Sequence, residues 1–353
     1  MRSNICIIGT ANIKHISLIS LYTRYFDMNG ISYDIVYLDR YGIEEETSAQ
    51  NTYKYTAIPK RGSFGRLKMF WDFRKYALKR IEEGRYKYII TWQTTGAYLF
   101  ADKLMKKYPR RYVINVRDYV AEEKWLFKWL IHRLIKKALF VTLSSPGFKT
   151  FLPKHDYLRV NSINEDLLEG IAPIQHKRDG VVRIGFAGNC RYFQESFKLI
   201  DTLGNDPRFE LWYCGTNSET LKDYAEQHNY TNVKTMPGFN PGETAEIMSG
   251  FDIVNSAFGN DARDNRTLIP IRLYTAVALH RPMLVNNSTQ LAQEVTENSL
   301  GFVIENYIGV GEKLYSYYNS LNFEDLDAKC DQYMVKSRAE NQLFYNQLDK
   351  LFS

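Results

Sequence analysis

The sequence has few cysteines and no long hydrophobic run. Its 353 residues include four cysteines, Cys6, Cys190, Cys214 and Cys330. No two of them form a CxxC pair, so a disulfide scaffold or a cysteine zinc site is not expected, and the spacing suits a reducing compartment. No stretch reaches the roughly 18 apolar residues of a membrane span. The apolar run over residues 5–8 is too short for a signal peptide, and we expect a cytoplasmic protein.

Low-complexity segments and short-period repeats are also absent. Hydrophobic residues make up 44% and charged residues 24% of the chain, which excludes a wholly disordered or collagen-like protein. At roughly 150 residues per domain, the length predicts two domains, each able to bury its own core. The net charge of +6 is mildly basic, so the position of the charges along the chain carries more information than their total.

Apolar strand-like runs alternate with amphipathic helical stretches through both halves of the chain. In the first half the expected strands cover residues 4–8, 33–38, 88–92, 112–116 and 140–143, and helices are expected over 16–28, 67–83, 95–107 and 122–137. The second half repeats the alternation from residue 181 to residue 320, after a polar linker over residues 161–179. Such alternation predicts parallel sheets with helices on both faces. Two doubly wound domains of this kind place a ligand cleft at the carboxyl ends of their strands.

Four segments of the second half carry a recognisable pattern. They are IGFAGNCRY at residues 184–192, LWYCG at 211–215, VKTMPGF at 233–239, and FDIVN at 251–255 followed by PIRLYTA at 270–276 and HRPMLV at 280–285. In order and spacing they resemble the nucleotide-sugar-binding half of GT-B glycosyltransferases, and within these the capsular and exopolysaccharide enzymes of a family 4-like group. The first half matches mainly in layout, with VRDY at 116–119 and SSPGF at 144–148 similar to a capsule-enzyme subgroup.

The resemblance implies an α/β protein of two Rossmann-like domains that face each other across a cleft. The expected acceptor-binding domain is residues 1–165, the nucleotide-sugar-binding domain is 166–325, and a C-terminal helix over 326–353 packs back towards the first domain. The expected donor is a nucleotide-diphosphate sugar, used as a co-substrate without any further cofactor. No DxD-like strand-end motif is present, so no metal is implied.

The sequence departs from the family at two glutamates. Many retaining members grip the ribose hydroxyls with a glutamate at the position of Thr275 and often carry another eight residues earlier, at the position of Thr267. Without these carboxylates, ribose binding must use a hydroxyl, the backbone or a neighbour such as Asp264 or Asn265. The departure favours an inactive binding protein as the alternative to an enzyme.

The expected donor-binding residues follow from the resembling segments and from phosphate chemistry. They are Gly188, Arg191, Lys198, Gly215, Phe239, Asn265, Arg272, Tyr274 and Thr275. A diphosphate needs backbone N–H groups at a helix N-terminus and one or two cations, which Gly188, Arg191 and Lys198 supply at the start of a helix. Arg272 also opens a helix, where a cation opposes the helix dipole and needs an anionic partner. The alternatives are an ordinary turn with solvated side chains and, for Arg272, a salt bridge to Asp261 or Asp264.

Two first-domain residues are candidates for the catalytic base. His15 lies in the loop after the first strand, and Asp118 follows the strand over residues 112–116. Both positions are carboxyl ends of strands, where an acceptor hydroxyl could be deprotonated. The alternative for Asp118 is to cap the helix that follows, with Glu122 in its first turn.

Two segments are basic and aromatic. Between Arg61 and Lys87 there are nine Lys or Arg and three acidic residues, and between Lys124 and Phe140 there are five Lys or Arg and none. Amphipathic basic helices with aromatic residues suit an anionic membrane surface. The alternative is a helix whose apolar stripe packs on the sheet. No nucleic-acid motif is present, so a nucleic-acid partner is not expected.

The sequence therefore predicts a glycosyltransferase of bacterial surface polysaccharide synthesis. It would move a sugar to a lipid-linked glycan acceptor, peripherally at the inner face of the cell membrane. The alternatives are a sugar-nucleotide epimerase or phosphorylase of the same fold, and a catalytically inactive nucleotide-sugar-binding partner of another transferase.

Overall fold

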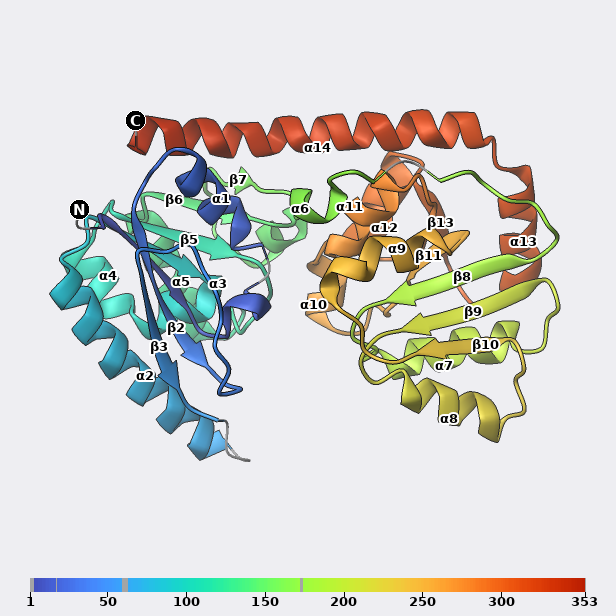
Figure 1. Ribbon diagram of the computed structural model, residues 1–353, viewed down its shortest axis with the longest axis horizontal. Coiled ribbons are helices and arrows are strands. Elements are labelled where there is room, and N and C mark those ends of the chain that lie inside the picture. The colour runs from blue at the N-terminus through green and yellow to red at the C-terminus, as the bar shows by residue number, and fades with distance from the viewer. Residues whose placement is uncertain (1–2, 17, 59–62, 172–173, 353) are drawn as a thin grey trace. The chain divides into compact units, whose positions relative to one another are not determined.

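The computed structural model describes residues 3–16, 18–58, 63–171 and 174–352, which form two compact units (Figure 1). The first unit extends to Asn161 and includes the chain from Glu340 onward, and the second unit is Ser162–Ala339. Arg61, the first residue of the expected basic segment, lies outside the described residues. Each unit is built around its own parallel sheet with covering helices.

The sheet of the first unit has seven parallel strands in the order β3-β2-β1-β4-β5-β6-β7. Their bounds are β1 (Ile5–Gly9), β2 (Tyr33–Asp39), β3 (Asn51–Thr56), β4 (Tyr88–Trp92), β5 (Tyr112–Val116), β6 (Phe140–Leu143) and β7 (Leu158–Arg159). Strands β1, β2, β5 and β6 are buried along their whole length, as expected for a parallel sheet covered on both faces. The strand order reverses between β1 and β4, where α/β folds place their ligands.

The helices of the first unit differ from the expected ones in several bounds, and the helix expected over residues 16–28 begins only at Ser20. They are α1 (Ser20–Met28), α2 (Ser63–Gly84), α3 (Gln93–Leu99), α4 (Ala101–Lys107) and α5 (Trp125–Lys137), with short 3₁₀ helices η1 (Ile13–His15) and η2 (Pro146–Thr150). The single helix expected over residues 95–107 is two helices, interrupted at Phe100, whose φ and ψ are −112° and 14°. The helix expected from residue 122 begins at Trp125 instead.

The sheet of the second unit has six parallel strands in the order β10-β9-β8-β11-β12-β13. Their bounds are β8 (Val182–Ala187), β9 (Phe209–Cys214), β10 (Val233–Met236), β11 (Ile253–Ser256), β12 (Met283–Asn286) and β13 (Gly301–Ile304). The order reverses between β8 and β11, so the loops after these two strands border the expected ligand site of this unit.

The helices of the second unit connect its strands in sequence. They are α6 (Glu165–Leu168), α7 (Phe193–Leu203), α8 (Glu219–Gln227), η3 (Pro241–Glu243), α9 (Thr244–Ser249), α10 (Arg263–Thr267), α11 (Ile271–Ala278), α12 (Gln290–Glu297), α13 (Val310–Ser320) and α14 (Phe323–Phe352). Helix α14 starts in the second unit, and its last residues belong to the first. There Phe344 packs on Tyr22 with ring centroids 4.9 Å apart. None of the described helices combines the length and apolar character needed to cross a membrane.

Candidate functional site

Two glycines bring the loops after β8 and β9 into close contact. Gly188 follows β8, has φ +138° and donates its N–H to the Cys214 carbonyl over 2.8 Å. Gly215 follows β9 and has φ +132°. A Cβ on Gly215 would lie 1.8 Å from the Gly188 carbonyl oxygen, so no side chain fits there. Both residues have the positive φ that glycine alone adopts readily, and they leave backbone uncovered at the carboxyl edge of the second sheet.

Arg272 lies at this same edge, in the first turn of α11. Its Nε donates to the Ala187 carbonyl over 3.0 Å, and one terminal nitrogen donates to Ser256 Oγ over 3.1 Å, so it joins the ends of β8 and β11. The guanidinium stacks on Phe186, 3.8 Å from the ring centroid. Burial, together with the nearby Arg191, lowers the pKa of Arg272 to about 10, so it remains a cation at neutral pH.

Arg272 forms no ion pair within the part of the chain that the structure describes, so neither Asp261 nor Asp264 neutralises it. Its hydrogen-bond partners are neutral oxygens. Partial burial of a cation without a counter-charge is costly, and a cation at a helix N-terminus also opposes the helix dipole. An anion at the carboxyl edge would relieve both costs.

The other two predicted cations differ from each other. Arg191 is exposed and lies over the Tyr192 ring, 4.9 Å from its centroid, with a hydrogen bond to the Tyr192 hydroxyl. Lys198 instead forms an ion pair with Glu195 three residues earlier on α7, at 2.5 Å. This hydrogen bond raises the pKa of Lys198. Lys198 is therefore already paired, whereas Arg191 is held only by its neighbour's ring and hydroxyl.

Glu195 is a residue that the sequence interpretation passed over, although its spacing from Lys198 is visible in the sequence. Its side chain is buried in the first turn of α7. The second carboxylate oxygen accepts hydrogen bonds from Asn286 Nδ2 at 3.2 Å and from the Tyr307 hydroxyl at 3.0 Å. Asn286 Oδ1 in turn accepts the backbone N–H of Gly259 at 2.7 Å. Glu195 thus connects segments that follow β8, β11, β12 and β13.

Phe239 lies beside an open pocket after β10. The pocket has a volume of about 470 Å³ and is lined by Met236, Pro237, Gly238, Phe239, Glu243, Glu246 and Ile247. Its size suits a nucleobase, and a partly apolar wall with a few polar groups is typical of small-molecule sites.

The remaining donor-site predictions fall on buried residues. Asn265 donates to the Phe258 carbonyl over 2.8 Å and so holds the loop after β11 against α10. Tyr274 is fully buried and stacks on Tyr333 at 6.3 Å, within the core of the second unit. Thr275 is 3% exposed, and Thr267 donates its hydroxyl back to the Arg263 carbonyl. None of these four side chains presents a carboxylate at the edge where Arg272 lies.

In the first unit, Asp118 lies directly after β5 and is half-buried. Its Oδ2 accepts a hydrogen bond from Gln93 Nε2 at 2.9 Å. It does not cap α5, which begins seven residues later, at Trp125. Glu122 also precedes this helix. Its carboxylate accepts the backbone N–H groups of Val120 and Ala121 within the connecting loop.

His15 ends the short helix η1 after β1, where its ring lies 5.0 Å from that of Tyr41. Partial burial, with the Lys14 charge adding to it, lowers the pKa of His15, which favours the neutral, proton-accepting imidazole at pH 7. The Glu45 carboxylate accepts the N–H groups of Ile13 and Lys14, and so fixes the backbone of η1.

Asp39 organises the base of this loop and is fully buried. It accepts hydrogen bonds from the Asn12 side chain at 2.7 Å, the Thr56 hydroxyl at 3.0 Å and the backbone N–H groups of Tyr41 and Gly42. Burial raises the pKa of Asp39, but these hydrogen bonds outweigh it and lower the pKa to about 2. The loop that carries His15 is therefore held by a buried carboxylate.

The predicted basic segments expose aromatic side chains on two helices. Leu67 and Trp71 of α2 are 68% and 57% exposed, and Trp125 and Trp129 of α5 are 79% and 51% exposed. Several α2 charges are paired, including Lys68 with Asp72 and Arg74 with Asp102. The apolar stripe of α5 that packs inward consists of Ile131, Leu134 and Ile135. The indole rings of α5 are additional to that stripe.

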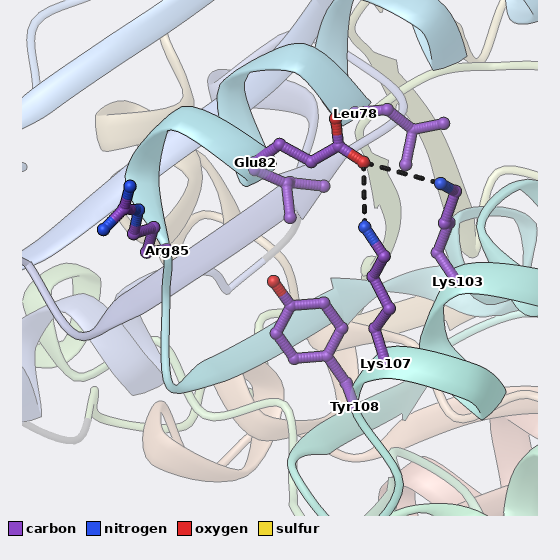
Figure 2. A pocket seen from close by; sticks show the side chains of 7 residues that line it. Leu78, Glu82, Arg85, Lys103, Lys107 and Tyr108 are labelled. Atoms are coloured by element: carbon purple, nitrogen blue, oxygen red, sulfur yellow. Dashed lines mark hydrogen bonds and ion pairs between the residues drawn. The ribbon is translucent and has the colours of Figure 1, made fainter.

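A further pocket with basic side chains lies at the amino ends of the strands of the first unit, opposite the edge that carries Asp118. A pocket of about 400 Å³ is formed by the ends of α2 and α4 and the segment just after each, from which the chain enters β4 and β5. Figure 2 shows the Glu82 carboxylate between Lys103 and Lys107, at 3.4 and 3.1 Å. Because Glu82 already pairs with Lys103 and Lys107, we do not consider this pocket to be the main ligand site.

No cluster of three or more metal-ligand side chains occurs within the described ranges. The chemistry available at the second sheet's carboxyl edge consists of cationic groups, uncovered backbone and the hydrogen-bonded Glu195.

Comparisons with known proteins identify the fold. No protein-family model matches the sequence, and no curated protein matches it. Several solved structures match over nearly the whole chain. Sucrose-phosphate synthase from Thermosynechococcus elongatus matches with a TM-score of 0.73 and 11% identity, over 99% of both chains. WaaG, a glycosyltransferase involved in lipopolysaccharide biosynthesis, matches with a TM-score of 0.66 and 12% identity, over 93% of this chain and 95% of its own.

Two further likenesses are to nucleotide complexes. Anabaena HepE in complex with UDP matches with a TM-score of 0.67 and 12% identity, over 99% of this chain and 100% of its own. The UDP-GlcNAc 2-epimerase of Neisseria meningitidis bound to UDP-GlcNAc has a TM-score of 0.62 and 12% identity, over 98% and 100%. The chain therefore has the GT-B fold, as its sequence predicted. At identities this low, the likeness concerns the fold.

Proposed function

We propose that this protein is a glycosyltransferase that transfers a sugar from a nucleotide-diphosphate donor. The observation that carries the proposal is Arg272, a half-buried cation that forms no ion pair with any described residue, at the edge where Gly188 and Gly215 leave the backbone without side chains. A diphosphate would neutralise the guanidinium, and the absence of a Cβ at the two glycines would let it approach the backbone closely. The complexes of HepE with UDP-glucose and of the epimerase with UDP-GlcNAc make a uridine donor the first to test.

The donor diphosphate is proposed to lie over the Gly188 loop, with its charge met by Arg272 and Arg191. The pocket beside Phe239 is proposed to take the base. Charge develops on the leaving diphosphate during transfer, so a preorganised cation there stabilises the transition state more than the bound donor. The ribose is proposed to use neutral groups of the kind supplied by Asn265 and Thr275, because the family's two glutamates are replaced.

Asp118, held by Gln93, is proposed as the base that deprotonates the acceptor hydroxyl, with His15 as the alternative. An inverting enzyme needs such a base, whereas in a retaining enzyme the leaving phosphate can take the proton.

The acceptor is proposed to be a lipid-linked glycan of bacterial surface polysaccharide synthesis. The exposed indoles of α5, among Lys124, Lys128 and Arg133, support an orientation on an anionic membrane. WaaG, which has a similar fold, is involved in lipopolysaccharide biosynthesis, and this supports the proposed pathway. Bound to the inner face of the membrane, the protein would meet both the nucleotide sugar and the acceptor.

The experiment has two stages. Thermal-shift screening with UDP-, GDP- and dTDP-sugars identifies the donor, because a ligand that binds the native state raises the unfolding temperature. The donor is then incubated with lipid-linked acceptors, and the products are analysed by mass spectrometry. A glycosylated lipid supports the proposal. Release of a different nucleotide sugar would instead identify an epimerase.

One observation favours a second function. The two family glutamates are replaced by Thr267 and Thr275, neither of which carries a carboxylate. An inactive nucleotide-sugar-binding partner would stabilise on donor binding yet yield no product alone, and would show activity only when mixed with a second transferase.

A further inference from the structure

The buried carboxylate at the start of α7 occupies a place that a diphosphate would otherwise favour. Helix α7 has 11 residues and follows the Gly188 loop directly. Its N-terminus offers unpaired N–H groups and a positive dipole end, which attract phosphate oxygens. Glu195 puts a negative charge in this first turn, and its side chain is 9% exposed. That charge opposes a diphosphate in the adjacent loop.

Glu195 also neutralises the nearest lysine. The Lys198 ammonium lies 2.5 Å from Glu195 Oε1, although the lysine side chain is 52% exposed. Arg272 has no such partner recorded in the described chain, and Arg191 has only Tyr192. Of the three predicted donor-site cations, Arg191 and Arg272 are therefore without an ion-pair partner among the described residues, whereas Lys198 is already paired.

The position of Glu195 is fixed from three further elements. Asn286 at the end of β12 and Tyr307 after β13 donate to its Oε2, and Gly259 after β11 packs on it. A Cβ on Gly259 would lie 2.9 Å from Glu195 Cγ. Gly259 is three residues beyond Ser256, whose hydroxyl accepts from Arg272. Glu195 is thus linked to the Arg272 site through the segment that follows β11, and it cannot turn away without losing several hydrogen bonds.

We propose that Glu195 is a positioning residue of the donor site that weakens the binding of nucleoside diphosphates. It holds Lys198 in an ion pair and keeps a negative charge at the start of α7, so that the diphosphate is bound through Arg272. The inference rests on the proposed function. Its benefit is release of the nucleoside-diphosphate product, a step that often limits turnover in transferring enzymes.

Calorimetric titration with UDP tests the inference through Glu195→Gln. Glutamine keeps the size of the side chain and an oxygen that can accept from Asn286 and Tyr307, but it removes the charge and frees Lys198. The Kd for UDP is expected to fall by about fivefold or more at low salt. At high salt the difference between the variant and the wild type is expected to be smaller, because salt screens the interaction between Lys198 and the diphosphate. The double variant Glu195→Gln/Lys198→Gln is expected to return towards the wild-type Kd, because the freed ammonium is gone.

Glu226→Gln is the matched control, since it removes a carboxylate paired with Lys222 on α8 and gives the same change in net charge. Its Kd is expected to equal that of the wild type. Unchanged or weaker UDP binding by Glu195→Gln, with a wild-type unfolding temperature, would overturn the inference, as would a loss in Lys198→Gln as large as in Arg272→Ala. If neither the wild type nor Glu195→Gln binds any nucleoside diphosphate, the proposed function fails and this inference with it. If the wild type binds and Glu195→Gln does not tighten, the inference alone fails.

Discussion

The side-chain amide of Gln93 donates a hydrogen bond to the Asp118 carboxylate over 2.9 Å, and so joins the residues that follow β4 and β5. Gln93 adopts a φ of +64°, a left-handed conformation that residues other than glycine rarely occupy. Strain of this kind costs about 1–3 kcal/mol and is concentrated at functional sites. The pair therefore marks the carboxyl edge of the first sheet as a place where a carboxylate is held in a fixed position.

Replacing Asp118 tests its role as the base. Asp118→Asn keeps the side-chain shape and the contact with Gln93, but it removes proton-accepting ability. Turnover is expected to fall by about 10²-fold, a typical contribution of general-base catalysis, while UDP affinity is retained. His15→Ala is measured in parallel as the alternative base. Near-normal turnover in both variants would contradict a base at either residue, and the anomeric configuration of the product, determined by NMR, would then be expected to match that of the donor.

The buried Asp39 gives the first unit an acid-sensitive point. Hydrogen bonds lower its pKa to about 2 in the folded protein, below the value of about 3.9 for an unfolded aspartate. Its contribution to stability is therefore complete above about pH 4 and is lost as the pH falls towards 2. Asp39→Asn is expected to lower the free energy of unfolding at pH 7 by about 1.5–3 kcal/mol, as for hydrogen bonds to a charged group. Denaturant titrations at pH 7 and pH 3 measure this, and an equal deficit at both pH values would contradict the assignment.

Gly215 is expected to tolerate no side chain. The added Cβ of Gly215→Ala would lie 1.8 Å from the Gly188 carbonyl oxygen, at a φ of +132°. We expect a loss of about 2 kcal/mol or more in stability, because both the overlap and the backbone conformation are unfavourable. Gly170→Ala, also at positive φ but with open space around its Cβ, separates the two effects. Equal unfolding temperatures for the two variants would show that the loops after β8 and β9 do not approach as described.

The exposed indoles of α5 are expected to contribute to membrane binding. The double variant Trp125→Ala/Trp129→Ala should reduce co-sedimentation with anionic vesicles, and added salt should reduce that of the wild type. Because these side chains are more than half exposed, the unfolding temperature is expected to change little. Equal sedimentation with neutral and anionic vesicles would contradict a role for the basic surface.

The arrangement of strands could be predicted because parallel sheets leave a strong sequence signal. Strands β1, β5 and β6 are short, mainly apolar runs that are buried along their whole length. Strand β3 was not predicted, since its sequence NTYKYT lies at an exposed edge and has no buried face. The interruption at Phe100 was also missed, because neither glycine nor proline marks it.

The sequence predicted which segments form the candidate site, but it did not predict the contacts of individual side chains. The Gly188 and Gly215 loops and Arg272 were expected near one another because they follow or precede strands at one sheet edge. The partners of individual side chains were harder to predict. The spacing of Glu195 and Lys198 allows a contact on a helix surface, but it does not show that Asn286 and Tyr307 bind the same carboxylate. These contacts come from segments more than 90 residues away.

The most direct measurement is a calorimetric titration of UDP into the wild type and Arg272→Ala. Loss of the charged hydrogen bonds is expected to weaken binding by about 1.5–3 kcal/mol, roughly 10- to 150-fold in Kd. Arg191→Ala is expected to weaken it in the same direction. Arg208→Ala, which breaks ion pairs with Asp206 and Glu312 before β9 begins, is the control and should bind UDP as the wild type does. Equal Kd values for the wild type, Arg272→Ala and Arg191→Ala would contradict a diphosphate site at the carboxyl edge of the second sheet.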